Sequence, residues 1–142
     1  MTPANSSSIS DGGAALVLMR MSEAKKRAVT PLAVIHGHAT HAQEPAWFTT
    51  APIGAVGKLL DKTGWDKGAV DLFEINEAFS AQYLGCEKEL GLDRDKVNVN
   101  GGAVSLGHPL GATGTRLILT LMQEMRRRGV RLGVASACIG GG

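Results

Sequence analysis

The stretch 100-NGGAVSLGHPLGATG-114 surrounds a single histidine, His108, with five glycines: Gly101, Gly102, Gly107, Gly111 and Gly114. Glycine loses more conformational freedom on folding than any other residue, so it is costly wherever an ordinary backbone would serve. A run of glycines around one imidazole therefore indicates tight turns and a close approach of the backbone to another segment or to a ligand. The histidine itself is either a structural group bonded to loop backbone or a functional group that a substrate approaches.

Outward from this loop, apolar runs alternate with amphipathic helical patterns. The expected strands cover residues 14–19, 32–39, 70–75, 97–99 and 131–137. The expected helices cover residues 22–28, 52–64, 77–91 and 115–129, with loops at 4–13 and 40–51. This alternation predicts an α/β fold with a mixed, mostly parallel sheet covered by helices.

The composition of the 142 residues is that of a globular protein, with 44% hydrophobic and 20% charged residues. The net charge of +2 is too small to indicate nucleic acid or a membrane surface as a partner. The basic run 126-RRR-128 is a solvated helix end or, less simply, a phosphate-binding patch. The sequence shows neither a signal peptide nor an apolar span of membrane length, so we expect a cytoplasmic protein with reduced thiols.

Three chemically capable residues follow predicted strands. Asn76 follows the strand 70–75, His108 lies in the loop after 97–99, and Cys138 follows 131–137. Ligands of open α/β sheets bind beyond the carboxyl ends of the strands, so parallel strands would place all three at one edge. The sequence therefore predicts a site that holds an amide, an imidazole and a thiol.

Each of these residues also has an ordinary structural interpretation. Asn76 is a favourable N-cap for a helix that starts at Glu77. Cys138 has small neighbours and fits a close-packed, buried position, as free cysteines usually do. Cys86 falls on the apolar stripe of the helix 77–91, and we expect it in the core.

Phosphate and metal sites have weaker support. The glycine loop matches neither GxxxxGK[ST] nor GxGxxG, although 111-GATG-114 opens a helix and helix N-termini attract anions. His36, His38 and His41 could suggest a metal, but His36 and His38 share a strand face with no acidic partner nearby, so no metal site is expected.

Three motifs together carry a resemblance to a known family. The stretch 98-NVNGGAVSLGHPLGATG-114 resembles the glycine–histidine signature of thiolases, 76-NEAF-79 resembles their asparagine motif, and 134-VASACIGGG-142 resembles their C-terminal cysteine motif. The resemblance implies the C-terminal half of a thiolase-like fold. Residues 1–30 would be the last strand and linker of the N-terminal domain, and residues 31–142 the C-terminal domain without its final strand.

The resemblance also implies an activity. Thiolases cleave 3-ketoacyl-CoA with CoA or run the reverse Claisen condensation of acyl-CoA. By resemblance, His108 activates the nucleophilic cysteine and Asn76 holds a water of the first oxyanion hole. Cys138 then moves the α-proton, and Gly140 contributes a backbone N–H to a second oxyanion hole. The expected substrate-binding residues are Ala78, Phe79 and Gly107.

By the same resemblance, the acyl-accepting cysteine lies upstream of this chain, so we expect the chain to be inactive alone. The expected substrates are acyl-CoA and CoA, with no further cofactor, and the family implies a homodimer or homotetramer. Two alternatives remain. A ketoacyl synthase would use two histidines and a cysteine, which the NEAF motif and Cys138 argue against. A non-catalytic, CoA-binding or assembly module of thiolase type stays open.

Overall fold

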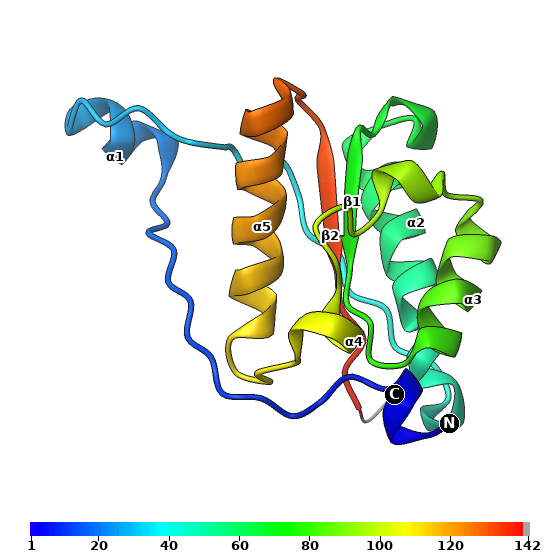
Figure 1. Ribbon diagram of the computed structural model, residues 1–142. Coiled ribbons are helices and arrows are strands. Elements are labelled where there is room, and N and C mark those ends of the chain that lie inside the picture. The colour runs from blue at the N-terminus through cyan, green and yellow to red at the C-terminus, as the bar shows by residue number, and fades with distance from the viewer. Residues whose placement is uncertain (141–142) are drawn as a thin grey trace.

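The computed structural model describes residues 1–140, and its centre is a pair of parallel strands. Strand β1 (Leu72–Ile75) pairs with β2 (Gly133–Ser136) in a register that sets Leu72 opposite Gly133 and Ile75 opposite Ser136. The two strands lie side by side between helical layers, with α5 on one face and α2 and α3 on the other (Figure 1). The expected α/β arrangement with parallel pairing is therefore present.

The helices follow the predicted periodicity closely. Their bounds are α1 Met21–Lys26, α2 Ala51–Thr63, α3 Ser80–Leu90, α4 Ala103–Leu106 and α5 Thr113–Arg128, with 3-10 turns at Pro3–Asn5, Pro45–Thr50, Lys67–Ala69 and Arg94–Lys96. The expected helices 52–64, 77–91 and 115–129 end at glycines, and Gly64, Gly91 and Gly129 close α2, α3 and α5 with φ of 68°, 59° and 67°. Such left-handed caps favour glycine, which has no Cβ to clash.

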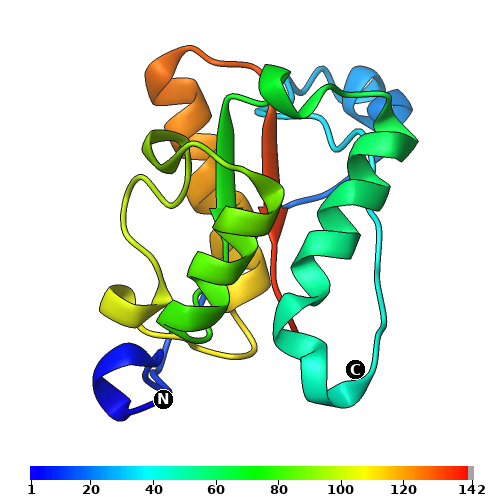
Figure 2. The same cartoon turned by 90° about the vertical axis from the view of Figure 1, so that its right-hand side faces the viewer.

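The hydrophobic core lies where the helices meet the strands. Figure 2 shows α3 in front of the sheet and α5 behind it. The buried cluster comprises Val56, Val70, Phe73, Ile75, Leu90, Val97 and Val134. On the other face, α5 buries Leu117, Leu121 and Met122. None of the helices formed by residues 1–140 is long and apolar enough to cross a membrane.

Two of the predicted strands are wrong. Residues 14–19 and 32–39 have no ladder partner within residues 1–140, and they run as extended backbone. Their large apolar side chains are exposed: Val17, Leu18, Leu32, Val34 and Ile35. Apolar β-branched character alone predicted these strands, but a strand also needs a neighbouring backbone to complete its hydrogen bonds.

The predicted strand 97–99 is also wrong, and Asn98 explains why. Val97 makes one parallel bridge to Phe73, after which Asn98 takes a left-handed conformation with φ of 47°. The Asn98 side chain then bonds to backbone groups of β1 that a continued strand would otherwise have bonded. Asn98 Oδ1 accepts from Ile75 N at 2.8 Å, and Asn98 Nδ2 donates to Ile75 O at 2.8 Å. Asparagine tolerates this backbone conformation better than most residues, so the strand ends here.

The packing of α5 gives a first testable prediction. Leu117 is 2% exposed, whereas its neighbour Ile118 is 40% exposed. Leu117→Ala should lower the free energy of unfolding by about 2–5 kcal/mol, because it removes buried methyl groups and leaves a cavity. Ile118→Ala should cost well under half as much. Urea denaturation followed by circular dichroism measures both, and equal losses would contradict this assignment of the buried face.

Candidate functional site

The candidate site begins where β1 and β2 end. The backbone N–H of Asn76, directly after β1, donates to the carbonyl of Ser136, the last residue of β2, at 2.9 Å. Cys138 follows two residues later. The parallel pairing therefore holds the segments that carry Asn76 and Cys138 against each other, as the sequence predicted.

The Asn76 side chain is buried without a hydrogen-bond partner. The residue is 1% exposed, and neither Oδ1 nor Nδ2 bonds to another group of the protein. The N-cap interpretation is wrong, because α3 begins only at Ser80 and its cap residue is Phe79. A buried amide without partners costs free energy, so we expect a water or a ligand atom to form hydrogen bonds with the Asn76 amide.

His108 is fixed at both its backbone and its ring. Its N–H donates to the carbonyl of Ser8 at 2.8 Å, and its Nδ1 lies 2.7 Å from the Thr113 hydroxyl oxygen. Burial lowers the pKa of the imidazole, and the nearby positive charge of Arg116 lowers it further. Both effects favour the neutral imidazole of His108, the form that accepts a proton.

The two thiols differ in accessibility. Cys86 is in the core as expected, with 0% exposure, and Gln82 Nε2 donates to its Sγ at 3.5 Å. Cys138 is half-buried. Burial raises the pKa of both thiols, so both are protonated near neutral pH. Of the two, only Cys138 has a thiol that a reactant can approach.

The N-terminal segment ties the two site loops together, which the prediction of a plain loop at 4–13 missed. Ser7 N–H donates to the carbonyl of Ala78 at 3.1 Å, and the next residue, Ser8, accepts from His108. Short bridges pair Ser6 with Phe79 and Ile9 with His108. The loop that follows β1 and carries Asn76 (the asparagine loop) and the loop that carries His108 (the glycine loop) are thus connected by the backbone of residues 6–9.

Gly107 marks that contact in the sequence. It has φ of 95°, and a Cβ there would fall 2.3 Å from Ser10 Oγ. Glycine is therefore required at 107 by the packing of the N-terminal segment. Its expected role in substrate binding stays a prediction. A Cβ on Gly140, by contrast, would meet nothing within 4 Å, and this exposed glycine leaves its backbone open.

The expected substrate-binding residues Ala78 and Phe79 contribute mainly backbone to the described structure. The Ala78 N–H donates to Gln82 Oε1 at 3.1 Å, while its carbonyl accepts from Ser7. Phe79 stands in extended conformation at the start of α3. Both are half-buried beside Asn76 along the chain, and their role toward a substrate remains a prediction.

Glu77 is a site residue that the sequence reasoning missed. Its Oε1 accepts from Asn98 Nδ2 at 3.0 Å, and its Oε2 accepts from the backbone N–H of Val104 at 3.1 Å. A Cβ on Gly102 would lie 2.0 Å from this carboxyl group. Glu77 therefore clasps the asparagine loop to the glycine loop, and Gly102 makes room for it. The signal was the glycine pair at 101–102.

A second missed feature is a buried ion pair behind the site. Glu74 on β1 accepts from Arg116 on α5 at 3.3 Å, and the Glu74 side chain is almost fully buried. Burial raises the pKa of Glu74 to about 7, against the lowering effect of Arg116. The negative charges of Glu77 and Glu124 add to the rise. The Glu74 carboxyl group therefore keeps its proton to a higher pH than an exposed glutamate does.

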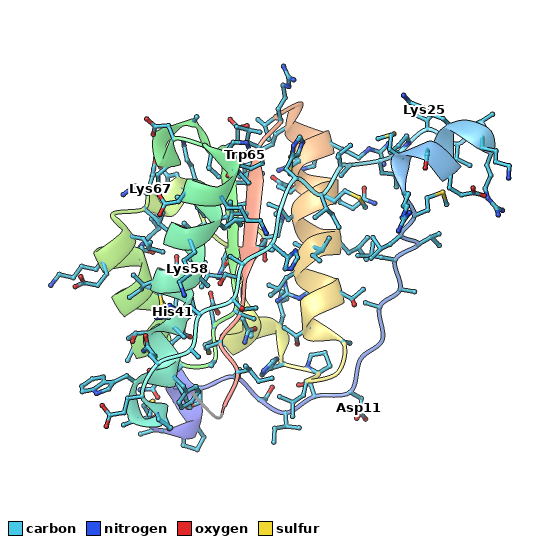
Figure 3. All side chains as sticks on the ribbon, turned by 180° about the vertical axis from the view of Figure 1, so that it is seen from behind. Asp11, Lys25, His41, Lys58, Trp65 and Lys67 are labelled. Carbon is cyan, nitrogen blue, oxygen red and sulfur yellow. The ribbon has the colours of Figure 1, made fainter. Side chains whose placement is uncertain are left out.

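A mostly apolar cavity of about 730 Å³ lies beside β2. Cys138 lines it, together with residues 32–41 and side chains from α2 and α5, whereas Asn76 and His108 do not. Figure 3 shows the extended segment that ends near His41 running along this side of the sheet. His36 packs against Trp65, with ring centroids 5.4 Å apart. Among residues 1–140, no three acidic, histidine or cysteine side chains are grouped as metal ligands.

Comparison with known proteins decides the family. The model of the family described as "Thiolase, C-terminal domain" matches residues 29–142. The chain belongs to the thiolase family. It is 51% identical over all 142 residues to the acetyl-CoA acetyltransferase of Chromobacterium violaceum and 49% identical to the cytosolic acetyl-CoA acetyltransferase of the mouse, Mus musculus. It spans 36% of the length of each.

Solved thiolase structures show the same fold. The acetyl-CoA acetyltransferase of Bacillus anthracis superposes on 99% of this chain with a TM-score of 0.97 and 50% identity, which is 36% of that enzyme's chain. Human mitochondrial 3-ketoacyl-CoA thiolase in complex with CoA superposes on 86% of it with a TM-score of 0.84 and 47% identity, over 31% of its own chain. The expected thiolase-like α/β fold is confirmed.

The clasp gives a prediction for stability. Both partners of Glu77 are donors, so Glu77→Gln turns one carboxylate oxygen into an amide donor that faces another donor. The substitution should lower the free energy of unfolding by about 1–3 kcal/mol. Glu89→Gln, an exposed change of the same charge on α3, is the control and should stay within about 0.5 kcal/mol. Urea denaturation compares them, and equal small effects would contradict the clasp.

The buried carboxyl group gives a prediction for pH dependence. An acid whose pKa is higher in the folded protein holds its proton after the unfolded chain has lost it. Its effect on stability is absent below about pH 4.5, and the fold loses stability as the pH rises toward 7. Glu74→Gln removes this titration while keeping an acceptor for Arg116. The stability of the native chain relative to this variant should fall by about 2 kcal/mol between pH 5 and pH 8, and parallel curves would contradict it.

Proposed function

We propose that this chain supplies the asparagine, histidine and cysteine half of an acyl-CoA C-acyltransferase site. The reaction is thiolytic cleavage of a 3-ketoacyl-CoA by CoA, or the reverse Claisen condensation of two acyl-CoA molecules. Membership of the thiolase family and the names of the related acetyl-CoA acetyltransferases support this reaction class. The proposed chemistry needs no cofactor beyond the CoA thioesters that react.

The observation that carries the proposal is the unpartnered amide of Asn76. A nearly fully buried amide with both polar atoms free is expensive unless it binds something. An amide at this position suits a bound water that donates to a thioester oxygen together with the Nε2–H of His108, once the imidazole has taken up the thiol proton. Preorganised donors of this kind stabilise the oxyanion that develops during acyl transfer.

The protons can be followed through the proposed cycle. An acyl-accepting thiol attacks the 3-keto carbonyl and gives its proton to neutral His108. The carbon–carbon bond breaks, and the enolate of acetyl-CoA takes a proton from Cys138. CoA thiol then attacks the enzyme thioester and gives its proton to the Cys138 thiolate. The acyl group passes to CoA, and the released enzyme thiolate takes back the proton that His108 holds. The raised pKa of Cys138 supports this order, because its resting thiol already carries the proton that the enolate needs.

Neither cysteine of the chain fits the acyl-accepting thiol. Cys86 is fully buried, and Cys138 is assigned to proton transfer. The acyl-accepting thiol would therefore come from outside these 142 residues, and the chain alone would not turn over. Because the human thiolase structure contains CoA, we extend CoA binding to this protein as part of the proposal. We also propose that the complete protein is a homodimer or homotetramer, as the family resemblance implies.

A chimera tests the proposal directly. The matching portion of the Chromobacterium violaceum acetyl-CoA acetyltransferase is replaced by this chain, and thiolysis of acetoacetyl-CoA is measured. The chimera should be active. Cys138→Ser and His108→Asn should each lower kcat by at least about 10²-fold, the usual contribution of an acid–base group. Cys86→Ala, the thiol control, should leave kcat within about threefold.

Each other outcome has a defined meaning. A folded but inactive chimera would contradict the catalytic proposal and favour a non-catalytic, CoA-binding or assembly module. Equal losses for Cys86→Ala and Cys138→Ser would contradict the assignment of the two thiols. The isolated chain is assayed beside the chimera, and turnover there that Cys138→Ser abolishes would place the acyl-accepting thiol within these 142 residues.

A further inference from the structure

Thr113 links the start of α5 to the imidazole of His108. Its hydroxyl oxygen lies 2.7 Å from His108 Nδ1 and 3.0 Å from the carbonyl oxygen of Pro109. The same carbonyl also accepts from the backbone N–H of Thr113 at 2.9 Å. Thr113 is buried, and as the first residue of α5 it has no freedom to swing away from the ring.

The single proton of the hydroxyl decides the direction of both bonds. A carbonyl oxygen can only accept, so the 3.0 Å contact with Pro109 is a hydrogen bond only when the Thr113 hydroxyl donates its proton there. The lone pairs of the same oxygen then face Nδ1 of His108, which must donate. We propose that Thr113 is a positioning residue that fixes the Nδ1–H tautomer of His108 and leaves Nε2 with its lone pair free.

This inference rests on the proposed function for its catalytic meaning, because a free Nε2 lone pair is what a proton acceptor for a nucleophilic thiol requires. Histidine in water has no such fixed tautomer, and each tautomer presents a different nitrogen as the base. A residue that selects the tautomer therefore selects which side of the ring does the chemistry. Thr113 does this from within the packed protein, without touching a substrate.

The tautomer is measured without any turnover, so its result is separable from the proposed function. Long-range ¹H–¹⁵N correlation spectra of the ¹⁵N-labelled chain at pH 8 distinguish protonated from unprotonated ring nitrogens. The signals of His108 among the four histidines are assigned with His108→Gln. In the native chain, Nδ1 should carry the proton. A protonated Nε2 and an unprotonated Nδ1 would overturn the proposal.

Variants give a second readout with opposite expectations. Thr113→Val removes the acceptor and keeps the shape, so the imidazolium loses a partner and the pKa of His108 should fall by roughly half a unit to one unit. If the hydroxyl instead donated to Nδ1, it would stabilise neutral imidazole, and its removal would raise this pKa. Thr113→Ser should restore the native value and tautomer. An unchanged or raised pKa in the valine variant overturns the proposal.

The control is Thr120→Val, which removes a hydroxyl from the same helix about two turns further on. It should leave the tautomer and the pKa of His108 unchanged, and an equal shift in this variant would overturn a specific role for Thr113. Backbone amide spectra establish that each variant is folded. If Thr113→Val does not fold, the tautomer of the native chain and the behaviour of Thr113→Ser still decide the question.

Discussion

Asn76 and Ser136 are held side by side because β1 and β2 run parallel and stay paired up to the last residue of each strand. Parallel strands end at the same edge, so whatever follows them in the chain must share that edge. The asparagine loop and the cysteine loop are consequently neighbours before any side chain contributes. A one-residue change of register would move each side chain of β1 to the opposite face of the sheet and disrupt its packing against the helices there, so the core also fixes the site.

The loop that carries His108 reaches this edge of the sheet although no third strand leads into it. Asn98 leaves strand geometry after one bridge, and its side chain takes up the backbone groups of Ile75. Glu77 and the residues Ser7 and Ser8 then connect the loops by bonds to backbone. Nearly every polar group near the site is thereby satisfied, as buried groups must be. Within residues 1–140, the buried side-chain atoms without a partner are His41 Nδ1 and both polar atoms of the Asn76 amide. The Asn76 amide lies at these loops and indicates a binding position.

The sequence predicts those features that depend on local chemistry. Gly64, Gly91 and Gly129 end helices where the pattern places them, and Cys86 is buried because it lies on an apolar stripe. The segments 14–19 and 32–39 fail because strand formation depends on a distant partner. The sequence also does not decide whether Asn76 caps the following helix or belongs to a site. The observed start of α3 at Ser80 separates these two interpretations. Contacts such as that of Glu77 with Val104 join residues far apart in the chain, and the hydrophobic periodicity of the sequence does not predict them.

The buried pair behind the site also bears on the protonation state of His108. Arg116 carries a positive charge, whereas burial raises the pKa of Glu74 to about 7. Below that pH the pair carries a net positive charge, which opposes protonation of the nearby imidazole. Burial and the positive charge of Arg116 therefore both favour the neutral imidazole of His108, the form that accepts a proton.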